Sequence, residues 1–177
     1  HRTRLPSDGG FAQATDDLNQ DGFVDLVVVN GFNGIKTNLN SYIYWGHVGG
    51  FRVERRAELP TLGATAAAVG DVNRDGFPDV VFSNSGRVYG KQPGPENNSF
   101  LYWGSADGFS ASHRLVLATA VASDVSIADL NQDGHPEIIF ANEGSGEVWG
   151  GVMIYWGNTS GSFSQEHRTM LAGQRSS

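Results

Sequence analysis

The chain has 177 residues, a length typical of one domain, and its 39% hydrophobic and 18% charged residues exclude a disordered segment. Cysteine is absent, which excludes disulfides, iron–sulfur clusters and cysteine nucleophiles. The formal charge of −7 argues against a nucleic-acid partner, and no apolar run is long enough to predict a membrane span.

Glycine is unusually frequent, with 24 residues against only six prolines. Because it follows no three-residue period, it excludes collagen and instead indicates many tight turns. No segment shows a sustained 3.6-residue apolar period, so helices are not expected. These observations together predict an all-β fold.

Three internal repeats organise the chain, and each holds an acidic loop, a Tyr-Trp-Gly element and a phenylalanine followed eight residues later by leucine. Successive acidic loops begin 54 and 58 residues apart, which suits a four-stranded propeller blade better than a leucine-rich or ankyrin repeat. The acidic loops span 17–25, 71–79 and 129–137; the Tyr-Trp-Gly elements span 44–46, 102–104 and 155–157; the aromatic–leucine pairs are Phe51/Leu59, Phe109/Leu117 and Phe163/Leu171.

Each repeat predicts four strands. The first is rich in small residues and precedes the acidic loop, the second is rich in Val, Ile and Phe, the third ends in Tyr-Trp, and the fourth runs from the phenylalanine to the leucine. In chain order the predicted strands are 12–18, 25–30, 41–45, 51–59, 64–72, 79–84, 99–103, 109–117, 123–130, 137–142, 152–156 and 163–171. We therefore expect β-propeller blades, as three four-stranded antiparallel repeats of a partial or oligomer-completed propeller.

The predicted domain organisation is not a whole number of blades. Residues 1–5 align with 167–171 when Leu5 and Leu171 are superposed, so the chain begins within the fourth strand of a further blade. One hypothesis is a segment of a longer propeller, and the other is head-to-tail pairing of copies, where two copies would supply six blades. The predicted divisions are 1–9 as a terminal outer strand of a missing or neighbouring blade, 10–59 as blade 1, 60–117 as blade 2, 118–172 as blade 3 and 173–177 as a tail.

Each acidic loop offers oxygen-bearing side chains at positions 1, 3, 5 and 9 and a backbone carbonyl at position 7. Calcium prefers roughly six to eight oxygen ligands, and glycine at position 6 permits the sharp reversal that such a loop needs. We therefore expect about three structural Ca²⁺ ions. The predicted ligands are Asp17, Asn19, Asp21, Asp25 and the Phe23 carbonyl; Asp71, Asn73, Asp75, Asp79 and the Phe77 carbonyl; and Asp129, Asn131, Asp133, Glu137 and the His135 carbonyl.

Two other interpretations of the loop compete with calcium. An EF-hand requires a glutamate at position 12 and flanking helices, whereas that position here holds Val28, Phe82 and Phe140 within predicted strands. A metal-free turn stabilised by Asp and Asn side chains is the second alternative. It is disfavoured because three carboxylates crowded into each of three loops would repel one another without a cation.

The acidic loops, at this spacing, resemble the FG-GAP or VCBS-type repeats of calcium-binding β-propellers, a family that includes the integrin α-chain head and certain propeller lectins. The resemblance covers nearly the whole chain. It implies four-stranded blades with metal between the first two strands. It also implies a secreted or cell-surface location and a role in adhesion or glycan recognition.

Several residues outside the loops are further candidates. We expect the tryptophans of the third strands to pack between blades, and the arginines at 56, 114 and 168 to lie on a solvated outer face. Specificity would reside in the variable segments 31–40, 85–98 and 143–151. The candidates are Tyr89 and Trp149 for stacking on a ligand; Asn30, Asn84 and Asn142, which end the second strands, for capping a turn or binding a ligand; and Asn97 and Asn158 for glycosylation.

No spacing of Ser, His and Asp suggests a catalytic triad or a nucleophile elbow, and no histidine cluster suggests a transition-metal site, so we expect no enzymatic activity. The sequence predicts a non-enzymatic, extracellular, calcium-binding module for adhesion or for recognition of a glycan or protein. One alternative is a structural subunit that self-assembles into a ring or filament through its terminal strands. Another is a non-catalytic segment of a larger secreted enzyme.

Overall fold

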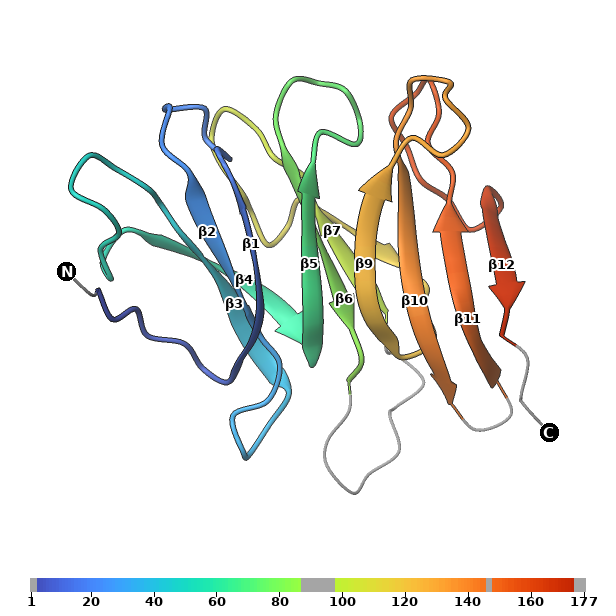
Figure 1. Cartoon of the computed structure of the whole chain (residues 1–177), viewed down its shortest axis with the longest axis horizontal. Coiled ribbons are helices and arrows are strands. Elements are labelled where there is room, and N and C mark those ends of the chain that lie inside the picture. The colour runs from blue at the N-terminus through green and yellow to red at the C-terminus, as the bar shows by residue number, and fades with distance from the viewer. Residues whose placement is uncertain (1–2, 87–97, 146–147, 174–177) are drawn as a thin grey trace.

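Every regular element is a β-strand in the part of the chain that the computed structural model describes, which comprises residues 3–86, 98–145 and 148–173. Strands form three separate four-stranded antiparallel sheets (Figure 1), which confirms the predicted all-β blades. The strands are β1 (Gly10–Asp16), β2 (Asp25–Asn30), β3 (Asn38–Tyr44), β4 (Arg56–Leu62), β5 (Ala64–Gly70), β6 (Asp79–Asn84), β7 (Ser99–Tyr102), β8 (Arg114–Leu117), β9 (Ala122–Ala128), β10 (Glu137–Ser145), β11 (Val148–Tyr155) and β12 (Arg168–Ala172). These described residues include no helix long and apolar enough to cross a membrane.

Each sheet is one repeat, with its strands hydrogen-bonded in chain order from β1 to β4, from β5 to β8 and from β9 to β12. We call these sheets blades 1, 2 and 3. The first strands of the blades, β1, β5 and β9, lie next to one another along one side of the array (Figure 1). Small side chains allow this close approach, as Ala66 and Ala68 of β5 pack against the apolar core between blades 2 and 3.

The second strands β2 and β6 have the predicted bounds, whereas the predicted fourth strands begin too early. The structure starts them at Arg56, Arg114 and Arg168. The residues before Arg56 instead form hydrogen-bonded turns, in which Gly50 N–H donates to the His47 carbonyl and Arg55 N–H donates to the Arg52 carbonyl. The repeated phenylalanine therefore lies in the loop between the third and fourth strands and is not part of the fourth strand.

Two apolar cores lie between the blades. The core between blades 1 and 2 contains Val27, Ile43, Val80 and Phe82, each fully buried. The equivalent core between blades 2 and 3 joins residues such as Val81, Leu101, Ile138 and Phe140. Blade 2 is thus apolar on both faces and is covered on both, as expected for a central propeller blade.

Aromatic stacking repeats at both junctions. Trp45 of blade 1 stacks on Phe109 of blade 2 with ring centroids 6.4 Å apart and planes 20° from parallel. Trp103 of blade 2 stacks on Phe163 of blade 3 at 6.5 Å and 27°. The predicted packing between blades is confirmed for Trp45 and Trp103, and the partner of each is the repeated phenylalanine of the following blade. The prediction for Trp156 is not confirmed, since its side chain donates a hydrogen bond to Thr169 of its own blade.

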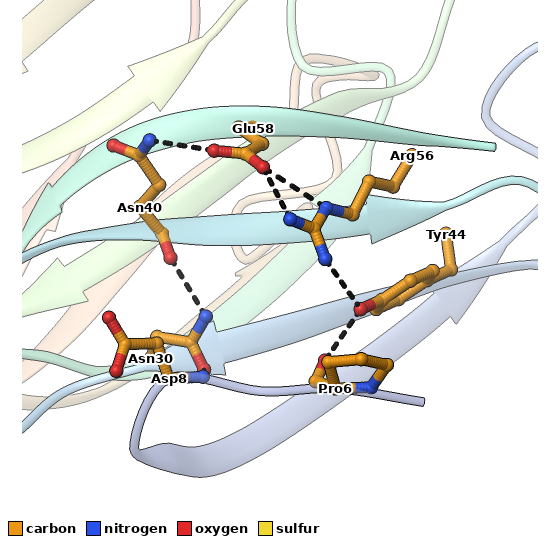
Figure 2. Close-up of polar contacts among 7 residues, drawn as sticks. All are labelled: Pro6, Asp8, Asn30, Asn40, Tyr44, Arg56 and Glu58. Carbon is orange, nitrogen blue, oxygen red and sulfur yellow. Dashed lines mark hydrogen bonds and ion pairs between the residues drawn. The ribbon is translucent and has the colours of Figure 1, made fainter. Parts of the chain in front are cut away.

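A buried tyrosine ties each blade to the chain segment that precedes it. The Tyr44 hydroxyl donates to the Pro6 carbonyl and accepts a hydrogen bond from Arg56 (Figure 2). The guanidinium of Arg56 also lies 4.3 Å from the centroid of the Tyr42 ring and forms an ion pair with Glu58. The same arrangement recurs as Tyr102 with Pro60 and Arg114, and as Tyr155 with Ala118 and Arg168.

These contacts correct the expectation that the arginines lie on a solvated face. The side chains of Arg56, Arg114 and Arg168 are half-buried and packed on tyrosine or phenylalanine rings. The expectation was wrong because each arginine is paired directly with a tyrosine of the third strand, so the two side chains lie on the same face of the sheet and contact each other.

We predict that Tyr102→Phe lowers the free energy of unfolding by about 1–2 kcal/mol, because Pro60 O and the Arg114 guanidinium both lose a hydrogen bond in a buried place. Denaturant unfolding would measure the loss. Tyr42→Phe is the matched control: its hydroxyl makes no hydrogen bond to the described chain, so its removal should leave stability within about 0.5 kcal/mol. Equal losses in the two variants would contradict a specific role for the tyrosine at the blade junction.

Candidate metal centres

The three acidic loops lie at the same end of the blades, each between the first and second strand, at the upper edge of Figure 1. The segment that joins β2 to β3 lies at the opposite end (Figure 1). Neighbouring acidic loops also contact one another, since the Gln20 side chain donates to the carbonyl of Gly76. The predicted ligands are therefore brought together loop by loop at one edge of the molecule.

All three loops have the same backbone form. Position 4 adopts a left-handed conformation at Gln20, Arg74 and Gln132, with φ between 59° and 62°. The position-6 glycines have φ of 87°, 94° and 86° in chain order, a region that side chains rarely adopt. One sequence pattern thus produces one geometry three times.

Side chains at positions 1, 3 and 5 hold this form. In the first loop the Asp17 carboxylate accepts hydrogen bonds from the N–H groups of Asp21 and Gly22, at 3.0 and 2.9 Å. Asn19 Oδ1 accepts from Asp21 N–H at 3.0 Å, and Asp21 accepts from Phe23 N–H at 2.9 Å. The same bonds recur in the loops that start at Asp71 and Asp129. These side chains remain close to solvent, so they stay accessible to an ion.

The acid at position 9 has a second role that the sequence did not reveal. Asp79 is fully buried, and its two oxygens accept hydrogen bonds from Val72 N–H at 3.0 Å and from Gly104 N–H at 2.9 Å. Asp25 makes the equivalent bonds to Leu18 and Gly46. This carboxylate therefore links the acidic loop to the Tyr-Trp-Gly element. The sequence feature that could have indicated this link is the glycine after Tyr-Trp, which occurs in all three repeats.

The third loop differs at position 9. Glu137 is fully buried, and its Oε2 accepts from Leu130 N–H at 2.6 Å, which preserves half of the pattern. Its Oε1 is buried and has no hydrogen-bond partner in the described part of the chain. The additional methylene of glutamate moves this oxygen away from the place that aspartate occupies in the other loops, and leaves an uncommitted acceptor.

The carboxylates of the first and second acidic loops lie close enough to change one another's pKa values. The pKa of Asp79 is raised to about 7, chiefly by burial and to a smaller extent by the nearby charges of Asp75 and Asp71, while two backbone N–H groups act in the opposite direction. The pKa of Asp25 is raised by burial and by Asp21 and Asp17 in the same way. A bound cation would relieve this repulsion.

The donor chemistry of the loops fits a hard cation. Within residues 3–86, 98–145 and 148–173, no three Asp, Glu or His side chains by themselves form a metal-binding group. A complete set also needs the asparagine at position 3 and the carbonyl at position 7. This all-oxygen set suits Ca²⁺ and contains no soft ligand, and Glu137 Oε1 adds an unpartnered buried oxygen.

The other sequence candidates lie away from these loops. Asn30, Asn84 and Asn142 are buried, and each uses its amide within the chain: Asn84 accepts from Leu62 N–H and donates to the Asn98 carbonyl. Asn158 lies in a turn and accepts from Ser160 N–H at 2.9 Å. Tyr89, Asn97 and the side chain of Trp149 lie outside the described residues.

Comparison with known proteins agrees with this geometry. Residues 17–82 match the FG-GAP-like repeat. Residues 17–82 therefore carry FG-GAP-type repeats. It is 33% identical to integrin alpha-7 of Homo sapiens over 126 residues, covering 64% of this chain and 10% of the relative. It is 28% identical to integrin alpha-6 of Homo sapiens over 149 residues, covering 76% of this chain and 12% of the relative. The chain spans about a tenth of the length of these curated relatives.

We predict that Gly104→Ala lowers the free energy of unfolding by about 3 kcal/mol, because a Cβ at this position would lie 2.2 Å from the Pro78 carbonyl oxygen. The substitution would also disturb the bond from Gly104 N–H to Asp79. Thermal unfolding measures the effect. Gly49→Ala is the control, since its nearest neighbour lies 3.5 Å away and its φ is ordinary; a similar loss in both variants would contradict the close approach at Gly104.

Proposed function

We propose that this chain is a non-enzymatic, calcium-stabilised propeller module that acts outside the cell in adhesion, through recognition of a protein partner. The observation that carries the proposal is the acidic loop, which occurs three times with one backbone form at one edge of the blades. The similarity to integrin α chains supports the adhesive role and the extracellular location.

Calcium has a structural role in this proposal. Each ion would be held by positions 1, 3, 5, 7 and 9, and it would neutralise carboxylates that otherwise repel one another around Asp25 and Asp79. Because position 9 also binds the Tyr-Trp-Gly element, order in the loop extends to the third strand of the blade.

We expect calcium to raise the unfolding temperature of the chain and chelator to reverse the rise. At calcium a hundredfold above the dissociation constant, each site would add about 2.7 kcal/mol to the free energy of unfolding. Asp75→Asn should remove one site's share of the calcium-dependent gain. It should change stability little in chelator, because the asparagine oxygen can still accept from Phe77 N–H and only the exposed hydrogen bond from the Asn73 side chain is lost.

The matched control for this experiment is Asp107→Asn, which makes the same change of charge in an exposed turn outside the loops. It should retain the full calcium-dependent gain. Unfolding curves that are identical in calcium and in chelator would refute the metal sites. A gain that both variants lose equally would show a general effect of charge instead.

The partner-binding surface is assigned to the end opposite the acidic loops. There the segment that joins β2 to β3 is held by Asn33, whose side-chain oxygen accepts from the N–H groups of Ile35 and Lys36 at 3.1 Å. This turn presents the Ile35 side chain 85% exposed. A large apolar side chain fixed on an ordered loop is typical of a contact residue in a protein interface.

We expect the chain to bind members of an array of immobilised extracellular-matrix proteins, and Ile35→Ser to weaken that binding about tenfold. Val48→Ser is the matched control, since Val48 is also 85% exposed but lies in the loop between β3 and β4 at the acidic-loop end. Binding to a glycan array alone, with none to proteins, would contradict a protein partner. Equal weakening by both variants would contradict the assigned end.

A further inference from the structure

We propose that the residue at position 4 of an acidic loop links its metal site to the site of the next blade, so that calcium binds cooperatively along the blades. Gln20 would couple the first loop to the second, and Arg74 would couple the second loop to the third. The inference rests on the proposed function, because it concerns how the ions assigned there influence one another. Neither residue is a predicted ligand, so each is a positioning residue.

The first link is a hydrogen bond between the first and second loops. Gln20 lies between the predicted ligands Asn19 and Asp21, and its side-chain amide donates to the carbonyl of Gly76. Gly76 in turn lies between positions 5 and 7 of the second loop, which both supply predicted ligands. The bond therefore joins the ligand-bearing segments of two neighbouring loops directly.

The second link repeats this contact one blade further along the chain. Arg74 has the same loop position as Gln20 and the same left-handed backbone, with φ of 62° and 59°. Its guanidinium reaches Gly134 of the third loop, where a Cβ would lie 3.4 Å from Arg74 Nη1. Position 4 of one loop thus lies against position 6 of the next at both junctions, along the edge where the loops follow one another (Figure 1).

A further contact confines the second loop from the side of blade 3. Gly161, in the connection between β11 and β12, has a φ of 64°. A Cβ at this glycine would lie 2.8 Å from the carbonyl oxygen of Asn73, which is the position-3 ligand of the second loop. The backbone of the next blade therefore packs closely against a ligand-bearing segment, and the two must move together.

These contacts make the order of one loop depend on the order of its neighbour. Without an ion the crowded carboxylates of a loop repel one another, which favours looser arrangements. An ion that fixes the first loop also fixes Gln20 against Gly76. Part of the ordering cost of the second loop is then already met, so the next ion binds more tightly. Coupling between sites is typically at least about fivefold in affinity.

Two chains, each with one loop disabled, separate the two links. Asp133→Asn should leave the first and second loops to bind calcium, and Asp21→Asn should leave the second and third. Isothermal titration calorimetry of each chain with Ca²⁺ should give a binding curve steeper than independent sites allow. The second ion should bind about fivefold more tightly than it does when the link is removed.

Each link should be broken by one substitution only. Gln20→Gly removes the side chain and retains the left-handed backbone. It should make the curve of the Asp133→Asn chain shallower and leave that of the Asp21→Asn chain unchanged, and Arg74→Gly should do the reverse. Gln132→Gly is the matched control in the full chain, since Gln132 has the same φ as Arg74 and its side chain is exposed. It should leave the steepness of the wild-type curve unchanged.

Four results would overturn the inference. Curves of independent sites in both chains would do so while leaving calcium binding intact. A curve that becomes steeper with Gln20→Gly would show that repulsion between neighbouring ions is the stronger effect. Equal effects of Gln20→Gly in both chains would show a general loosening of the fold, which circular dichroism in chelator would also detect. Absence of calcium binding in every chain would instead refute the proposed function, and the inference with it.

Discussion

A four-stranded sheet with apolar side chains on both faces is stable only when both faces are covered, and this constraint governs the whole molecule. Blade 2 satisfies it completely, with Val80 and Phe82 facing blade 1 and Val81 and Leu101 facing blade 3. Alternate residues along one strand thus serve two different cores. The apolar faces of a blade are therefore buried only by the adjacent blades, and a blade on its own would expose them to water.

Polar contacts fix how the blades meet once apolar burial has brought them together. The tyrosine at the end of each third strand reaches back to the segment that enters its blade, and an arginine of the fourth strand supports its hydroxyl. The asparagine at the end of each second strand binds the same entering segment, as Asn84 does at Leu62. Since these groups are buried and directional, they specify the position of one blade against the next more narrowly than apolar packing does.

The all-β blade architecture could be predicted from the sequence because the same motifs occur in each of the three repeats. The bounds of β2 and β6 were predictable, since each begins at the last acid of the loop and runs through a Val- and Phe-rich segment. The start of β4 was not, because Phe51 continues the apolar pattern although a turn separates it from the strand. The arginines were also misjudged, since their ring contacts depend on the register between β3 and β4.

The loops show a similar division between what was predictable and what was not. The oxygen pattern at positions 1, 3 and 5 identified candidate ligands without any structure. The hydrogen bonds of Asp79 to Val72 and Gly104 could not be anticipated, because they link segments 25 residues apart through backbone groups that no sequence pattern displays. The partnership of Trp45 with Phe109 was hidden for the same reason, as it joins two different repeats.

The separation of the two ends of each blade has a practical consequence for engineering. At one end the acidic loop and the Tyr-Trp-Gly glycine are in tight backbone contact, so the chain there has a fixed length. At the other end the connection between second and third strands differs in length from repeat to repeat while the sheet is unchanged. A foreign peptide, an epitope tag or a fluorophore site grafted between Asn33 and Lys36 would therefore be displayed without disturbing the sheet, which makes the repeat a scaffold for presenting loops.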